Sequence, residues 1–311
     1  MKLVILVPAY NEEEDIKNTI QSIPKKVRGI DQVEILVVND GSTDKTSDIA
    51  LDAGADKIIS HQRNMGVGAT FMTGIRNAIM MNADIVVTID ADSQFNSEQI
   101  PDLIVPILNR QLDVVIGSRF LNKDPIGIPK IKLIGNKIFS KIVSWLTSQK
   151  FTDSQTGFRA YSKNALLKVS IINDFTYTQE VLIDLKFKGL QIGEIPVSVK
   201  YDENRKSRVV KNIFQYSIRA LSIIIRTLTF HRPILAFSIL GAILAGGGIL
   251  AKILTISKVF HVTTELSTGL IILGIVAFMM GVFANMIFKR QAFAERDMRH
   301  YLDEANYFKD R

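Results

Sequence analysis

The chain has 311 residues with 38 basic and 31 acidic side chains, a formal net charge of +7 and a pI near 9.4. This length accommodates one large domain and a further segment, and the basic balance suits a polyanionic partner such as nucleotide phosphates, nucleic acid or an anionic membrane surface. The absence of cysteine excludes disulfides, thiolate metal sites and a cysteine nucleophile.

Short β-branched runs and helical stretches alternate over roughly the first 200 residues. The first run ends at Pro8 without a small-residue cleavage site, so we do not expect a signal peptide. The alternation predicts an α/β domain with a doubly wound, mostly parallel sheet. The expected strands are Leu3–Val7, Glu34–Val38, Lys57–Ser60, Ile85–Ile89, Asp113–Ile116 and Ile192–Val199, and the expected helices are Glu12–Ile23, Asp44–Ala53, Gly68–Met81, Ser97–Asn109 and Ile131–Trp145.

The turns after the first two strands lack the glycine-rich sequences that hold phosphates in dehydrogenases and P-loop proteins. After the first strand, the acidic run 12–14 is expected to open the helix, where it complements the helix dipole and repels phosphate. After the second strand, Asp40 is placed to accept hydrogen bonds from a base edge or a ribose. Ser42 or Thr43 is equally suited to cap the following helix.

Asp90-Ala91-Asp92 follows the apolar run Ile85–Ile89 and is the most informative motif of the chain. Side chains alternate along a strand, so both carboxylates are expected to point the same way at the edge where open α/β sheets bind ligands. Such a pair suits a hard divalent cation that bridges to phosphates, with Gln94 as a third oxygen donor if the backbone stays extended. The alternative is turn chemistry, because Asp often ends strands.

One further residue and three further segments are candidates for ligand binding. Arg119 follows the fifth strand, where its guanidinium is suited to clamp phosphate or is simply a solvated surface group. Small residues in segment 64–69 permit close backbone approach to a ligand, although many turns share this feature. Segment 153–159 is polar and has no obvious packing role. Segment 201–208 is either a solvated charged face or a site for an anionic headgroup or diphosphate.

Two uncharged runs, Pro233–Ala251 and Leu266–Phe288, are each long enough to cross about 30 Å of hydrocarbon. Basic residues flank both outer ends, so the positive-inside rule predicts a cell-membrane protein whose N-terminal domain and both termini are cytoplasmic. Before these runs, an apolar and a basic stripe predict an interfacial helix, or a helix packed on the soluble domain. The expected organisation is a catalytic domain 1–208, an interfacial helix 209–231, a transmembrane hairpin 232–290 with spans of about 233–253 and 266–288, and a charged tail 291–311 that either joins subunits of a homo-oligomer or is a surface helix.

Five motifs, taken in order, resemble one family. The series covers about residues 1–210 and resembles the inverting GT-A glycosyltransferases, in the branch of dolichyl-phosphate mannose synthase and related polyprenyl-phosphate glycosyltransferases. The two-helix C-terminus is similar to that of bacterial polyprenyl-phosphate glucosyltransferases. The motifs are Pro8-Ala9-Tyr10-Asn11-Glu12, Asn39-Asp40-Gly41-Ser42-Thr43-Asp44, Asp90-Ala91-Asp92-Ser93-Gln94, Gly117-Ser118-Arg119 and Thr156-Gly157-Phe158-Arg159.

The resemblance implies a nucleotide-sugar site, with each role carried over by matching position. Asp92 and Gln94 would hold Mg²⁺ or Mn²⁺ against the diphosphate. The basic segment 201–208 departs from the Arg-x-x-Gly-x-Ser-Lys pattern that is common in relatives. The role of each of its cations is therefore left open. The donor-binding residues would be Pro8, Tyr10, Glu12, Val38, Asp40, Asp90, Ala91 and Lys206. The catalytic residues would be Asp92, Arg119, Asp153, Arg205 and Arg208, with Asp153 orienting a partner or acting as a base.

The implied reaction is attack by dolichyl or polyprenyl phosphate on the anomeric carbon of a GDP- or UDP-hexose, with inversion. A phosphate monoester has a second pKa of about 6, so it is largely dianionic near neutral pH and needs little help from a general base. Such an enzyme has to position the acceptor and neutralise the leaving diphosphate. The partners would be the nucleotide sugar, the lipid phosphate and the bilayer.

Three other functions fit the sequence less well. A glycan-extending synthase of this fold carries Gln-x-x-Arg-Trp, whereas the only tryptophan here, Trp145, lies in Ser144-Trp145-Leu146. A catalytically silent membrane scaffold would have no use for the carboxylates of Asp90 and Asp92. Nucleic-acid binding is not expected, because no interleaving of aromatic and basic residues accompanies the positive charge.

Overall fold

The protein is described by a computed structural model that covers residues 1–122, 125, 128, 130–170, 177–200, 222, 225–226, 228–229, 232–257 and 263–309, with only the backbone for 130–132, 289 and 291–309. Residue contacts divide the chain into two units, Met1–Val209 and Val210–Arg311. The basic loop 201–208 and most of the expected interfacial helix 209–231 lie outside the described residues.

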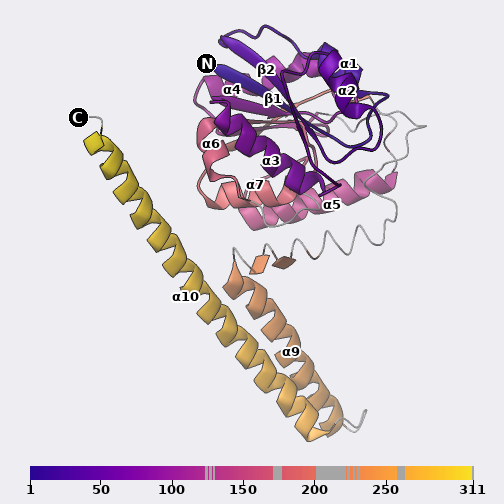
Figure 1. Ribbon diagram of the computed structural model, residues 1–311. Coiled ribbons are helices and arrows are strands. Elements are labelled where there is room, and N and C mark those ends of the chain that lie inside the picture. The colour runs from indigo at the N-terminus through magenta and orange to yellow at the C-terminus, as the bar shows by residue number, and fades with distance from the viewer. Residues whose placement is uncertain are drawn as a thin grey trace. The chain divides into compact units, whose positions relative to one another are not determined.

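Within its described part, the first unit is built on a seven-stranded sheet in the order β3-β2-β1-β4-β6-β5-β7. Helices surround this sheet (Figure 1). The strand pairs are parallel except for β6, which runs antiparallel between β4 and β5. The predicted doubly wound, mostly parallel sheet is therefore confirmed. The strands are β1 (Lys2–Ala9), β2 (Gln32–Asn39), β3 (Lys57–Ser60), β4 (Ile85–Thr88), β5 (Val114–Ser118), β6 (Arg159–Ser162) and β7 (Ile192–Pro196).

Both faces of the sheet are covered by helices, which is why β1 is apolar without alternation. Alternate residues of β1 join a core with helices α1 and α4 on one face. On the other face Leu6 contacts Gly74 of α3, where an added Cβ would lie 2.3 Å from the Leu6 Cδ1 atom. The helices of this unit are α1 (Ile16–Ser22), α2 (Thr46–Asp52), α3 (Val67–Met80), the 3-10 turn η1 (Ser97–Gln99), α4 (Ile100–Leu108), α5 (Lys130–Thr147), α6 (Lys163–Lys168) and α7 (Thr178–Phe187).

Two expectations about helix starts are wrong. Helix α1 begins at Ile16, so the acidic run 12–14 lies in the turn before the helix instead of opening it. Helix α2 begins after Lys45, so neither Ser42 nor Thr43 caps it. The Ser42 hydroxyl instead accepts a hydrogen bond of 2.9 Å from the backbone amide of Asn11. This bond joins the turns that follow β1 and β2.

The described part of the second unit contains the long helices α9 (Pro233–Ile256) and α10 (Thr264–Lys309). By length and composition, Pro233–Ile256 and Thr264–Phe288 are able to cross a membrane. Only 11% and 17% of their most apolar stretches are buried, unlike the core helix of a soluble protein. Both helices therefore indicate membrane association, and α10 continues as a helix through the charged tail.

Glycines bring α9 and α10 into close backbone contact. An added Cβ at Gly241 would lie 2.6 Å from the Gly274 carbonyl oxygen, and one at Gly248 would lie 2.6 Å from the Ser267 carbonyl oxygen. At Gly246 and Gly247, by contrast, an added Cβ would have no described neighbour within 4 Å. Small residues at such a seam let two membrane helices approach through their backbones.

Candidate functional site

The carboxyl ends of β1, β2 and β4 bring most of the predicted donor-binding residues to one edge of the sheet. β1 pairs in register with β2, so that Pro8 lies beside Val38. Asp40 follows β2, and Tyr10 and Glu12 follow β1. Asp90, Ala91 and Asp92 follow β4, which is the other neighbour of β1.

The Asp90-Ala91-Asp92 segment follows the end of β4 and turns at Ala91 and Asp92, so the strand on which the predicted alternation depended does not extend this far. β4 ends at Thr88, and Ser93 has a φ of 56°, so the backbone is not extended as far as Gln94. Thr19 of α1 holds this turn: its hydroxyl lies 3.0 Å from the Ala91 carbonyl oxygen and accepts a hydrogen bond of 3.1 Å from the Ser93 amide. The backbone amide of Gln94 donates a hydrogen bond of 3.1 Å to Asp92 Oδ1. Hydrogen bonds to α1 therefore position the turn.

Negative charge accumulates around this turn. Burial, and then the neighbouring Asp92 carboxylate, raise the pKa of Asp90 to about 7 from an ordinary value of 3.8, and Glu12 adds to the effect. The positive charges of Arg119 and Arg159 act in the opposite direction. A site with excess carboxylate charge and oxygen donors favours a hard divalent cation.

The donor set fits Mg²⁺ or Mn²⁺ that is shared with a diphosphate. Asp92 adds a carboxylate close to Asp90, whereas the extended backbone on which the Gln94 oxygen depended is not present. Among the described residues, no three His, Cys, Asp or Glu side chains are grouped so as to hold a metal ion. Mg²⁺ is usually held by one or two carboxylates together with substrate phosphates, and this arrangement requires no larger cluster.

Gly157 provides the surface against which the Asp90 carboxylate lies. An added Cβ at Gly157 would lie 2.6 Å from Asp90 Oδ1 and 3.0 Å from Oδ2. The Thr88 hydroxyl donates to the Gly157 carbonyl oxygen at 2.5 Å, which ties this segment to the end of β4. The 156–159 motif is visible in the sequence. Its contact with Asp90 forms only because β6, which begins at the end of this motif, pairs with β4.

Arg159, at the end of that motif, is fully buried. Its guanidinium donates to the carbonyl oxygens of Thr178 at 2.7 Å and Ser154 at 2.9 Å. Its charge also lowers the pKa of Asp90. Arg159 therefore joins three segments of the domain and provides positive charge close to the acidic turn.

Arg119 is held by Asp153 at the end of β5. The Nε and Nη2 atoms of Arg119 donate to the two Asp153 carboxylate oxygens at 2.6 and 2.9 Å, and Asp153 is completely buried. A bidentate pair of this kind fixes the orientation of a guanidinium. Of the two roles predicted for Asp153, orienting a partner or acting as a base, the geometry favours the first.

Glu194 of β7 supports this pair and was not predicted from the sequence. Its Oε1 and Oε2 atoms lie 3.0 and 2.9 Å from the Thr152 amide, and Oε1 accepts a hydrogen bond of 3.1 Å from the Asp153 amide. The Thr152 hydroxyl donates to Oε2 at 2.9 Å. Burial raises the pKa of Glu194. No local signal marks this residue, because the segment that it holds is 41 residues away along the chain.

Asp40 is buried and holds a neighbouring turn. Its carboxylate accepts hydrogen bonds of 2.9 Å from the amides of Met65 and Gly66, and His61 Nδ1 lies 2.8 Å from its Oδ1 atom. His61 Nε2 lies 2.9 Å from the Thr73 hydroxyl of α3. Asp40 therefore positions the glycine-containing segment 64–69, which the sequence suggested only as a separate candidate.

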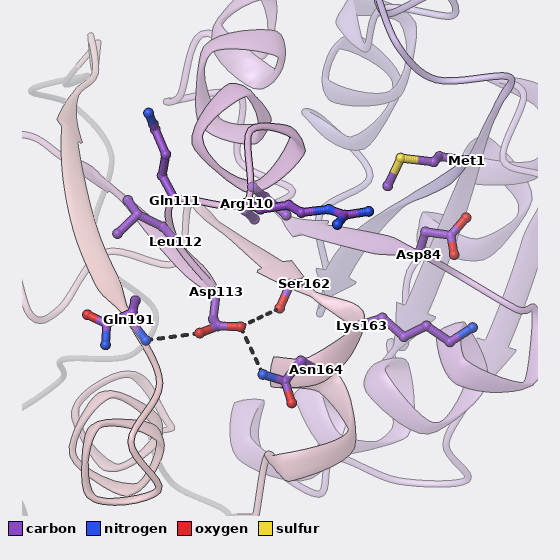
Figure 2. Close-up of a pocket in the computed structure, with 11 residues that line it drawn as sticks. Met1, Asp84, Arg110, Gln111, Leu112, Asp113, Ser162, Lys163, Asn164 and Gln191 are labelled. Carbon is purple, nitrogen blue, oxygen red and sulfur yellow. Dashed lines mark hydrogen bonds between the residues drawn. The ribbon is translucent and has the colours of Figure 1, made fainter. Parts of the chain in front are cut away.

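A hollow of about 300 Å³ lies at the opposite edge of the sheet, beside the starts of β1, β4, β5 and β7 (Figure 2). The carboxylate of Asp113, which lines this hollow, accepts hydrogen bonds from the Asn164 side chain at 2.9 Å and from the backbone amide of Gln191 at 3.0 Å. Asp113 thus joins the starts of two strands to α6. The predicted Arg205, Lys206 and Arg208 lie outside the described residues and are not placed at either edge.

The mostly parallel sheet, with an acidic turn after β4, is that of a GT-A glycosyltransferase. Residues 4–174, more than half of the chain, match the glycosyl transferase family 2, and the chain belongs to this family. It is therefore a glycosyltransferase.

Named relatives agree with this assignment, and a solved structure shares the fold. The UDP-N-acetylglucosamine–dolichyl-phosphate N-acetylglucosaminyltransferase of Methanococcus voltae is 34% identical over 226 residues, covering 66% of this chain and 88% of that protein. The dolichol-phosphate mannosyltransferase of Pyrococcus furiosus is 29% identical over 231 residues, covering 71% and 58%. The structure of glucosyl-3-phosphoglycerate synthase from Mycobacterium tuberculosis with uridine diphosphate shares the fold, with a TM-score of 0.57 and 22% identity over 73% of this chain and 79% of that chain.

Proposed function

We propose that the protein transfers a hexose, with inversion, from GDP-mannose or a UDP-hexose to dolichyl or polyprenyl phosphate at the cytoplasmic face of the membrane. The acidic turn beside Arg119, in a chain that also carries two membrane-length helices, is the observation that supports this most directly. The names of the relatives agree with a lipid-phosphate acceptor. Residues 1–208 would be the catalytic domain, 209–231 an interfacial helix and 232–290 the membrane anchor.

The donor would bind along the edge formed by Pro8, Tyr10, Glu12, Val38 and Asp40, with its sugar near Asp90 and Ala91. Mg²⁺ or Mn²⁺, held by Asp92 and Gln94, would supply Lewis-acid neutralisation of the leaving diphosphate. Thr19 already fixes the backbone of this turn through the Ala91 carbonyl and the Ser93 amide. Little rearrangement of the turn would then be needed when the donor binds.

Arg119 would present its charge to the phosphates from a fixed orientation. Its bidentate pair with Asp153 holds the guanidinium in place before substrate arrives, and preorganised charge is the larger part of such catalysis. The acceptor phosphate is largely dianionic near neutral pH, so the site has to position it but does not have to remove a proton. The buried, ion-paired Asp153 agrees with that requirement. Arg205, Lys206 and Arg208 would complete the acceptor site.

Transfer of radiolabelled sugar to organic-extractable lipid tests the proposal. Purified protein is incubated with Mn²⁺, dolichyl phosphate and each nucleotide sugar in turn, together with Asp92→Ala and, as a surface-carboxylate control, Asp48→Ala. We expect label in lipid from one donor with the wild type and Asp48→Ala, and none with Asp92→Ala. Metal-dependent binding of a donor without lipid label would contradict the acceptor assignment and favour a glycan-extending enzyme. A protein that binds none of these donors would contradict the proposed choice of nucleotide sugar.

A further inference from the structure

His61 connects Asp40, at the expected nucleotide edge of the sheet, to helix α3. Its Nδ1 atom lies 2.8 Å from Asp40 Oδ1, and its Nε2 atom lies 2.9 Å from the Thr73 hydroxyl of α3. The His61 side chain is only 10% exposed, and that of Asp40 only 5%. Hydrogen bonds at both nitrogens fix the orientation of an imidazole ring, so His61 holds Asp40 and Thr73 at a set separation.

The surrounding hydrogen bonds assign the tautomer of His61. The Asp40 carboxylate accepts hydrogen bonds of 2.9 Å from the backbone amides of Met65 and Gly66, so it is the acceptor toward His61 as well. The Nδ1 atom of His61 therefore carries a proton. In the neutral ring the Nε2 atom then accepts from the Thr73 hydroxyl.

Asp40 keeps an acceptor position for a ligand. A carboxylate offers about four positions to hydrogen-bond donors, and His61, Met65 and Gly66 occupy three of them. The backbone amide of Asp40 donates to the Ala9 carbonyl oxygen at 2.8 Å. This bond places Asp40 beside the end of β1, at the edge where the donor is expected to bind.

Helix α3 gives the connection through His61 a fixed far end. Gly74 follows Thr73 and packs against β1, because an added Cβ at Gly74 would lie 2.3 Å from the Leu6 Cδ1 atom. Gly66, at the start of the same helix, has a φ of 95° and donates its amide to Asp40 Oδ2. Asp40 is thus held by the start of α3 and, through His61, by its second turn.

We propose that His61 is a positioning residue of the nucleotide site, which holds the Asp40 carboxylate in the orientation that accepts an N–H group of the nucleobase. This inference rests on the proposed function, because it requires a nucleotide-sugar donor at this edge. His61 acts through Asp40, since its two nitrogens already bind Asp40 and Thr73. Removing it should weaken binding of the base and leave binding of metal and diphosphate at Asp92, after β4, unchanged.

Comparison of nucleotides with pyrophosphate separates this role from a purely structural one, because pyrophosphate carries the diphosphate charge without a base. Full-length protein in detergent with Mn²⁺ is titrated calorimetrically with UDP, GDP or pyrophosphate. We expect the wild type to bind one nucleotide more tightly than pyrophosphate. In His61→Gln the amide nitrogen lies near the position of Nε2 instead of Nδ1. We expect this variant to bind that nucleotide about tenfold more weakly and pyrophosphate as before.

His61→Asn is the matched rescue variant, because its amide nitrogen lies near the position of Nδ1 and keeps the hydrogen bond to Asp40. It should bind the nucleotide nearly as the wild type does, as should Gln62→Ala at the neighbouring exposed position. Wild-type affinity in His61→Gln would overturn the proposal. Equal losses in His61→Asn and His61→Gln, or a parallel loss of pyrophosphate binding, would also overturn it, because His61 would then act only through the stability of the domain.

Failure of the proposed function gives a different result, which is visible in the wild type alone. A wild-type protein that binds neither nucleotide more tightly than pyrophosphate would contradict a nucleotide-sugar donor at this edge. The role of His61 would then be overturned together with that donor.

Discussion

Asp90 is held where its negative charge is unfavourable, against Gly157 and beside Asp92. The pKa of Asp90 is raised to about 7 from 3.8, so the folded protein binds this proton more tightly than the unfolded chain does. Its contribution to stability is therefore full below about pH 4 and is lost as the pH rises through about 7. Each pKa unit corresponds to about 1.4 kcal/mol.

We predict that the thermal unfolding midpoint of the metal-free protein falls between about pH 5 and about pH 8. Asp90→Asn should flatten this dependence, because the neutral amide does not titrate. Mn²⁺ should raise the midpoint of the wild type more at the higher pH, where Asp90 is ionised. Differential scanning fluorimetry measures all three effects. An Asp90→Asn variant that keeps the wild-type slope would assign the pH dependence to another group.

Gly157 gives a second prediction at this scale. Gly157→Ala would place a Cβ 2.6 Å from Asp90 Oδ1, so the carboxylate has to move. A displacement of about 1 Å in a reacting site lowers the rate by about a hundredfold, and we expect a loss of this order in sugar transfer. Gly135→Ala is the control, because no described atom lies within 4 Å of its added Cβ. Equal activity of the two variants would show that Asp90 tolerates displacement.

At the scale of elements, β7 supports the site through Glu194. Glu194→Gln removes a carboxylate that accepts hydrogen bonds from the Thr152 and Asp153 amides and points an NH₂ group toward one of these donors. We expect a loss of about 1–3 kcal/mol in unfolding free energy, together with a fall in kcat as Arg119 loses its fixed orientation. Denaturant unfolding and steady-state kinetics measure the two effects. Glu98→Gln, at an exposed position, should change neither, and an unchanged kcat in Glu194→Gln would separate β7 from catalysis.

The close contact between α9 and α10 at Gly241 and Gly274 leads to a separate prediction. Gly241→Ala would place a Cβ 2.6 Å from the Gly274 carbonyl oxygen, which forces the two backbones apart. We expect a lower unfolding midpoint in detergent, whereas Gly247→Ala, on the same helix but away from the seam, should have little effect. Equal midpoints for the two variants would mean that the helices do not depend on this contact.

The sequence predicted the parts of the fold that local pattern controls. Strand Lys57–Ser60 has the predicted bounds, and the acidic turn follows the predicted strand. β6 was not predicted, because Arg159–Ser162 is short and its place between β4 and β5 depends on pairing with strands that are distant in the sequence. The bend at Ser93 and the role of Glu194 depend on tertiary contacts with Thr19 and Thr152, which no local pattern encodes.

For the whole molecule, the charge asymmetry around the two spans predicts both termini in the cytoplasm. Because the chain has no cysteine, a single introduced cysteine reports the side of the membrane on which it lies. We expect an impermeant maleimide to label Ser257→Cys, just after α9, in intact cells. Lys163→Cys in the sheet domain should be labelled only after permeabilisation. The reverse pattern would invert the proposed topology.

The insertion of β6 between β4 and β5 also determines when the nascent chain is able to complete the sheet around the acidic turn. Ile85 pairs with Ser162, and Val114 pairs with Ile192, so the acidic turn is synthesised well before the strands that complete its surroundings. Residues 197–232 then separate the end of β7 from α9. At about 5–20 residues per second, this stretch takes roughly 2–7 seconds to translate. All seven strands are therefore synthesised before the first of the two long apolar helices.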